Sequence, residues 1–219
     1  MNFKHLLGTI MLVGGIAAGT PASANLIFQT GLVGGSGDVS NVQFNPCGLG
    51  SGSGMTVQGC LNDAQNTLVN FTSDETLVIS GGGQAIIGAA DGSFNSLTIS
   101  LADMAMGFDK LQLNIDAIAD GSATFQAVDQ FGTVFNFGSF ALSGRGQNFF
   151  TLGSEDGQVA MSFSIVSTVP LSNISDVGQV RIGTAVVAVP EPASLALFGA
   201  GLFGLGMIRR RAARRNELA

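Results

Sequence analysis

The stretch Leu111-Gln112-Leu113-Asn114-Ile115 alternates apolar and polar side chains at every step. Successive side chains of a β-strand point to opposite faces of the sheet, so this pattern predicts a strand with one apolar and one polar face. The same alternation, rich in β-branched and aromatic residues, recurs on both sides of it. The sequence therefore predicts further strands at residues 26–33, 67–71, 76–80, 85–87, 94–101, 123–128, 133–137, 149–152, 159–165 and 180–186.

Glycine-containing turns separate these strands, as at Asp91-Gly92, Asp120-Gly121 and Asp156-Gly157. Short strands about 8–15 residues apart, without a stretch that has a convincing helical face, predict an all-β fold. We expect an antiparallel β-sandwich, jelly-roll-like in its connections. Residues 146–182 loosely resemble the closing strands of sandwich domains in exported bacterial proteins.

The N-terminus has the parts of a secretory signal peptide. A basic Lys4 precedes an apolar run at residues 6–18, and Ala22-Ser23-Ala24 places small residues where signal peptidase recognises them. We therefore expect residues 1–24 to be removed, with Ala22 and Ala24 directing cleavage before Asn25. The alternative, an uncleaved membrane anchor, is disfavoured because the run is shorter than the roughly 20 residues of a typical span.

The C-terminus also has three parts in order. Pro190-Glu191-Pro192 is followed by an uncharged apolar stretch at residues 193–208 and by a basic tail at residues 209–219. The stretch predicts a transmembrane helix, and basic residues resist translocation, so the tail should stay in the cytoplasm as a stop-transfer signal. A permanent single-pass anchor is the alternative. The basic residues of the tail are Arg209, Arg210, Arg211, Arg214 and Arg215.

This C-terminal order resembles the PEP-CTERM sorting signal over residues 189–219. The resemblance implies that Pro190, Glu191 and Pro192 are the motif recognised by exosortase, a membrane-embedded protease-transpeptidase. The protein would then occupy the inner membrane only transiently. Proteins with this signal occur in Gram-negative bacteria that make exopolysaccharide, and are associated with biofilm. A cell-surface or extracellular-matrix location follows from the resemblance, but the role of the exported domain does not.

The exported domain, residues 25–189, is strongly acidic. It holds thirteen acidic residues and only three basic ones, Lys110, Arg145 and Arg181, because six of the nine basic residues lie in the two terminal signals. This charge argues against nucleic-acid binding, which requires a basic face. It favours solubility, and it would repel acidic polysaccharide unless divalent cations bridge the two.

Cys47 and Cys60 are the two cysteines, and both lie in the exported domain. Secreted proteins mature in an oxidising compartment, so we expect a disulfide between them. It would close a glycine-rich loop, and a cross-link over about 15 residues stabilises by on the order of 3 kcal/mol in the chain-entropy model. A metal or redox pair is the weaker alternative, because no histidine is available as a further ligand.

Missing residue types limit the chemistry of the exported domain. His5 is the only histidine and lies in the signal peptide, which excludes histidine-dependent catalytic triads and histidine metal sites. Tyrosine and tryptophan are absent, which argues against a strong sugar-stacking surface. We therefore expect no enzyme activity. The only side chains left as candidates for catalysis are carboxylates. They belong to Asp74, Glu75, Asp116, Asp120, Asp129, Glu155 and Asp156.

Calcium is the one ion that this composition suits, although we expect no cofactor. Oxygen atoms of aspartate, asparagine and glutamate side chains at loop ends are typical Ca²⁺ ligands. No stretch forms an EF-hand loop, so a solvated acidic rim is the favoured interpretation. The candidate ligands are Asp38, Asn41, Asn45, Asp63, Asp74 and Glu75.

Three functions from different classes remain. The sequence favours a non-catalytic structural protein of the cell surface or extracellular matrix, sorted by exosortase and associated with exopolysaccharide. A carbohydrate-binding module is the alternative. A secreted glycosidase or lyase is least favoured, because a glycosidase needs two carboxylates that face each other roughly 5–9.5 Å apart across a cleft.

Overall fold

The computed structural model describes residues 25–35, 37–49, 52–80, 83–167, 174–187 and 198–204. Residues 198–204 are helical. The other described residues contain twelve strands and one short 3-10 helix. In chain order these are β1 (Asn25–Thr30), β2 (Ser40–Gln43), η1 (Asn45–Cys47), β3 (Ser53–Leu61), β4 (Leu68–Ser80), β5 (Ile86–Ala89), β6 (Ser96–Leu101), β7 (Met106–Ala117), β8 (Gly121–Asp129), β9 (Val134–Leu142), β10 (Asn148–Glu155), β11 (Ala160–Ser167) and β12 (Ile174–Val186).

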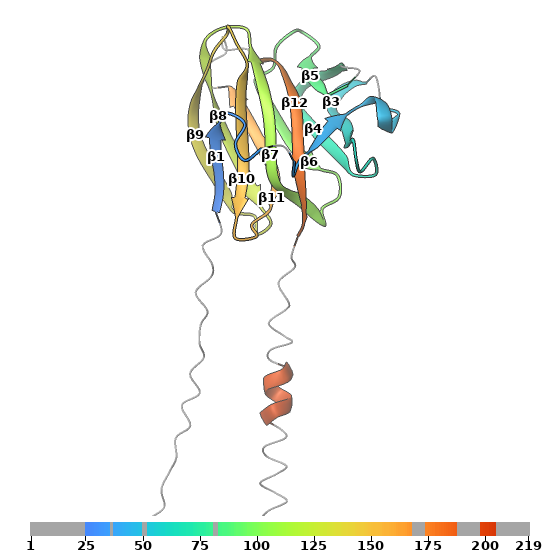
Figure 1. Ribbon diagram of the computed structural model, residues 1–219, viewed down its shortest axis with the longest axis vertical. Helices are drawn as coiled ribbons and strands as arrows, with labels where there is room; N and C mark the ends of the chain where they lie inside the picture. The colour runs from blue at the N-terminus through green and yellow to red at the C-terminus, as the bar shows by residue number, and fades with distance from the viewer. Residues whose placement is uncertain are drawn as a thin grey trace, which may run out of the picture.

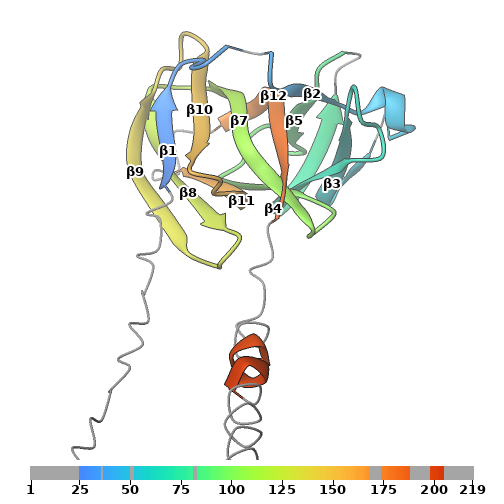
Figure 2. The same cartoon turned by 60° about the horizontal axis from the view of Figure 1, so that its bottom comes forward.

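The strands form two packed layers. β1, β10, β7 and β12 make one layer, and β9, β8, β11, β6, β4 and β3 make the other (Figures 1 and 2). Every pairing between the described strands is antiparallel. β2 and β5 each pair with β12 on one side and with the second layer on the other, so the sheet is continuous around this edge. At the opposite edge, β1 and β9 each pair with one described strand only.

The predicted all-β antiparallel sandwich is confirmed, while its jelly-roll-like connections stay a prediction. Two segments predicted as separate strands, residues 67–71 and 76–80, form the single strand β4. Alternation continues between them because Ser73 is buried and donates to the backbone carbonyl of Ser96 at 2.8 Å. The intervening polar residues therefore do not end the strand.

Two strands were not predicted, β2 and β3. In the case of β3, the reason is that it lies in the glycine-rich segment that we expected to be a loop. The structure shows why one of these glycines is suited to a strand. A Cβ atom on Gly59 would lie only 2.8 Å from Val42 Cγ1 and 3.0 Å from the carbonyl oxygen of Gln43. A residue without a side chain lets β2 approach β3 this closely.

Phenylalanine rings fill the space between the layers beside β1. The ring of Phe28, on β1, lies with its centroid 4.5–5.4 Å from five other rings. Aromatic pairs at such separations contribute about 0.5–1.5 kcal/mol each beyond the area they bury. Side-chain packing therefore holds β1 at its edge position. The five partners are Phe125 of β8, Phe137 and Phe140 of β9, Phe150 of β10 and Phe163 of β11.

Replacing Phe28 with alanine should lower the free energy of unfolding by about 3–5 kcal/mol, because the substitution leaves a cavity among these rings. Phe131 is 62% exposed, so Phe131→Ala is the matched control and should change the free energy by less than about 0.5 kcal/mol. Urea denaturation of the full chain in detergent measures both. Equal effects of the two substitutions would contradict the central role of Phe28.

Candidate functional site

Cys47 and Cys60 form the predicted disulfide, with their Cα atoms 6.1 Å apart. The bond joins the end of η1 to β3, where Cys60 is fully buried. Cys60 is also the register partner of Gln43 on β2. The cross-link therefore fastens η1 to a paired β2–β3 unit, and the segment between the two cysteines is partly strand instead of all loop.

The two processing signals lie largely outside the described residues, as do Ala22, Ala24, the Pro190-Glu191-Pro192 motif and the arginine tail. Asn25, which follows the predicted cleavage site, is the first residue of β1. Of the predicted transmembrane helix only residues 198–204 are described, and these are helical with exposed side chains. Among the described residues, no helix has both the length and the apolar character that crossing a membrane requires.

The candidate calcium ligands do not converge. Lys110 donates to the carboxylate of Asp38 at 2.9 Å, and this hydrogen bond lowers the pKa of Asp38. The hydroxyl of Ser96 donates to Asp74 and lowers the pKa of that carboxyl. Nowhere in the described ranges do three His, Cys, Asp or Glu residues gather closely enough to hold a metal ion. Of the other candidates, Asn45 begins η1 and Asn41 accepts from Gln84. Ser40, which precedes Asn41, donates to Asp63, and Asn95 donates to Glu75, which follows Asp74.

Three of the seven carboxylates considered for catalysis, Asp120, Asp129 and Asp156, stabilise turns or lie on a turn. Asp129 is buried and accepts hydrogen bonds from the backbone N–H groups of Phe131 and Thr133 at 2.9 and 2.7 Å. Asp120 accepts one from the N–H of Gly144 at 2.9 Å. Asp116 differs from these, because its side chain lines a cavity.

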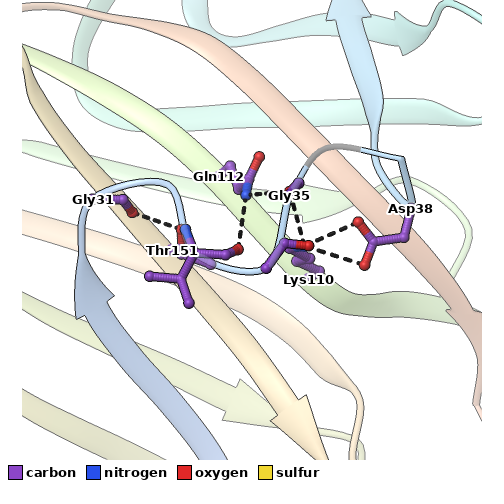
Figure 3. A network of polar contacts seen from close by, with 8 residues as sticks. Gly31, Gly35, Asp38, Lys110, Gln112 and Thr151 are labelled. Atoms are coloured by element: carbon purple, nitrogen blue, oxygen red, sulfur yellow. Dashed lines mark hydrogen bonds and ion pairs between the residues drawn. The ribbon is translucent and has the colours of Figure 1, made fainter.

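A strap, residues 31–35 and 37–39, crosses the outer face of β7 on its way from β1 to β2 (Figure 3). Lys110 Nζ and Gln112 Nε2, both on β7, donate to the carbonyl oxygen of Gly35 at 3.1 and 3.0 Å. The strap therefore covers a polar row of β7 side chains, so that Lys110 is only 9% exposed and Gln112 is fully buried.

Next to the strap, two positions further along β7, the outer face opens into a groove with a volume of about 490 Å³. Residues of β5, β7 and β12 line it, together with the segments that precede β5 and β10. Six of the nine described lining residues are polar, and Ile86 and two glycines complete the set. The polar residues are Gln84, Asn114, Asp116, Gln147, Asp176 and Gln179, and the glycines are Gly83 and Gly178.

Strand register brings these residues together. Asn114 and Asp116 are two positions apart on β7, so their side chains lie on the same outer face. β12 places Gly178 opposite Asn114 and Asp176 opposite Asp116. Gly178 has no side chain to cover its neighbour, which leaves space beside Asn114. The next residue, Gln179, has a φ of 53° within an irregularity of the β12 ladder, and it also lines the groove.

Two features of the groove oppose folding. Burial raises the pKa of Asp176, and the negative charge of Asp116 raises it further. Asn114 is only 6% exposed, and its Oδ1 atom makes no hydrogen bond to any described residue. A buried polar atom without a partner costs about 1–3 kcal/mol. The groove thus holds one buried acceptor atom, Asn114 Oδ1, that lacks a donor among the described residues, beside the carboxyl groups of Asp116 and Asp176.

Sequence reasoning named only Asp116 among these lining residues. The alternation of residues 111–116 places Asn114 on the same strand face as Asp116. This shared face is the one feature of the sequence that could have pointed to Asn114 as a lining residue. Nothing in the sequence shows which residues of β12 lie opposite them, so Asp176 and Gly178 were missed. The groove is a product of register between distant segments.

The fold and the C-terminal sequence together define an antiparallel β-sandwich followed by a sorting motif. Residues 188–211 match the PEP-CTERM protein-sorting motif, so the chain carries this signal at its C-terminus, and the predicted resemblance is confirmed. Proteins with this motif are exported, are associated with the cell surface and are processed by exosortase. No curated protein matches the chain.

Solved structures of family 29 carbohydrate-binding modules resemble the sandwich distantly. One, from Piromyces equi, is 13% identical, covers 80% of this chain and 99% of its own, and has a TM-score of 0.33. A second is 9% identical, covers 78% of this chain and 98% of its own, and also has a TM-score of 0.33. These identities and scores are too low to transfer a binding site to this chain.

Replacing Asp176 with asparagine should raise the free energy of unfolding at pH 7. A carboxyl whose pKa is raised by folding destabilises the folded state when it is ionised, and the cost vanishes below the unfolded pKa of 3.8. The gain from Asp176→Asn should therefore shrink as the pH falls toward 3.8. Thermal unfolding between pH 3.5 and pH 7 measures it, with the exposed Glu155→Gln as the charge-matched control. A destabilised Asp176→Asn variant at pH 7 would contradict this account.

Proposed function

We propose that exosortase delivers this protein to the cell surface or extracellular matrix of a Gram-negative bacterium, where its sandwich serves as a non-catalytic component of the exopolysaccharide layer. The sorting motif at residues 188–211 is the observation that carries the proposal, because it indicates the export route. The disulfide between Cys47 and Cys60 supports it, since such bonds persist in oxidising compartments.

The arrangement of carboxylates supports a non-catalytic role. Glycosidases hold two carboxylates on either side of the sugar, with space for the substrate between them. Asp116 and Asp176 are instead register partners on neighbouring strands, side by side on one face. Such a pair can accept hydrogen bonds from one ligand, but it does not enclose a glycosidic bond.

Carbohydrate binding is the second candidate function, and the groove beside β12 is the observation that favours it. Amide and carboxylate groups of Gln84, Asn114, Asp116 and Asp176 suit sugar hydroxyls, which both donate and accept hydrogen bonds. We expect the full chain in detergent to be retained on the immobilised exopolysaccharide of the native host. Buffers with and without calcium separate direct binding from cation bridging. Passage of the protein without retention in both buffers would contradict this candidate.

Replacing Pro190, Glu191 and Pro192 together with alanines should block processing. The protein should then accumulate, uncleaved, in the inner membrane of the native host, because exosortase no longer recognises it. Cell fractionation with mass measurement of the purified protein detects both the location and the uncut tail.

A host strain without exosortase supplies the control for this experiment. Wild-type protein should accumulate there in the same form, and the alanine variant should show no additional defect. Normal sorting and processing of the alanine variant in the unmodified host would show that the tail is an ordinary anchor.

A further inference from the structure

The groove beside Gly178 has the properties of a built site, because one of its buried groups has no partner within the described protein. Asn114 lies within β7, three residues before its end, with 6% of its surface exposed, and its Oδ1 makes no hydrogen bond to the described residues. Buried amides in folded proteins nearly always have their oxygen bonded to protein or to an ordered molecule. Asn114 also lines the groove, so a group bound there could reach this oxygen.

The dimensions of the groove suit a small organic ligand better than a single cation. Its volume of about 490 Å³ falls within the roughly 300–1,000 Å³ of small-molecule sites. A calcium ion needs six to eight oxygen atoms at about 2.3–2.6 Å. The described lining offers two neighbouring carboxylates, Asp116 and Asp176, and four amides around an open depression.

The charge of the groove disfavours an acidic ligand unless divalent cations bridge the two. Asp116 and Asp176 are its only charged lining residues among those described. Two cations of the sandwich are engaged elsewhere: Lys110 with the strap and Asp38, and Arg181 with Asn41 at 3.2 Å. Arg145 is in the turn before β10, outside the lining. An anionic sugar would therefore meet two carboxylates and no described compensating charge.

The geometry points to a binding site for a neutral saccharide, with its ring over Gly178 and Ile86 and its hydroxyls on Asp116, Asp176 and Asn114. Carboxylate oxygens accept hydrogen bonds from hydroxyls, and charge-assisted bonds of this kind are the stronger ones. Gly178 supplies the space, and Ile86 supplies an apolar surface for the carbon face of a sugar. This inference deepens the second candidate function and rests on it, by naming the ligand class and its location.

Gly178→Val tests the location. A Cβ atom at residue 178 would lie 3.7 Å from Ile86 Cγ1 and 3.8 Å from Asp176 Oδ1, which are ordinary contacts, so the added methyl groups should occupy the groove without disrupting the strand. Gly178→Ala is a milder second variant. Gly153→Val is the matched control, because Gly153 also lies in a strand of this layer, outside the groove, and a Cβ there has no described neighbour within 4 Å.

The assay is electrophoresis of the full chain, in detergent, through gels that contain the host exopolysaccharide after anion-exchange separation into neutral and acidic fractions. The neutral fraction should retard the wild-type protein and the Gly153→Val variant equally. Gly178→Val should weaken this retardation at least tenfold, and Gly178→Ala by a smaller factor. Unchanged retardation of Gly178→Val, with its circular dichroism spectrum also unchanged, overturns the proposed location.

Asp176→Asn adds a readout that loss of structure cannot imitate. Because this substitution should stabilise the fold, weaker binding by the variant cannot arise from unfolding. Wild-type binding should also weaken as acidification protonates Asp176. The variant should lack the part of this pH dependence that Asp176 contributes, while Asp116, the register partner of Asp176, is present in both proteins.

The two fractions separate failure of this inference from failure of the proposed functions. Retardation by the acidic fraction alone overturns the neutral-saccharide inference but leaves carbohydrate binding in place. Retardation by neither fraction overturns both. Sorting by exosortase is measured separately in the host and does not depend on either result.

Discussion

The packing of Phe28 between the two layers is the contact on which the remainder of this structure depends. β1 has backbone hydrogen bonds to one described neighbour only, so its position rests on the rings that surround Phe28. The strap begins where β1 ends, and Thr151 donates to the carbonyl of Gly31 at 2.7 Å to hold that junction (Figure 3). The strap in turn buries one part of the outer face of β7 and leaves the next part open. The core therefore determines, through β1, where the groove begins.

The scarcity of cations in this domain gives each one a structural consequence. Lys110 is nearly buried and bonds two strap carbonyl groups as well as Asp38, so its charge is neutralised locally. This arrangement stabilises the strap. It also leaves the ammonium group of Lys110 unable to neutralise the polar side chains that follow it on β7 and line the groove. Asn114 and Asp116 follow Lys110 and Gln112 on the same face of β7, and they receive no such compensation from the described residues. A negative groove next to a neutral strap is the result.

Alternation in single segments, such as residues 111–115, predicted the strands, and the ordered parts of the tail predicted the sorting motif. Both are local patterns, which a linear sequence displays directly. β3 escaped prediction because glycines such as Gly59 look like loop residues, although here close strand approach favours a glycine. The groove was not predicted, because Asp116 and Asp176 are far apart in the sequence and become neighbours only through the register of β7 and β12. Composition suggested acidic residues as ligands, but it could not indicate that the relevant ones share a face.

The groove gathers several features that each weaken the fold. Gly178 lies within a strand, where a residue without a side chain contributes no packing. Asp116 and Asp176 place like charges on register partners, and the Asn114 oxygen is buried without a bond to the described residues. Sequences that specify a structure are usually consistent at every level, and local violations concentrate where function requires them. One such feature alone would be unremarkable in a sandwich of this size. Their convergence on a single concave site is explained if a hydrogen-bonding ligand supplies the donor that Asn114 lacks, and the polysaccharide layer that we propose as the location of this protein would offer hydroxyl groups.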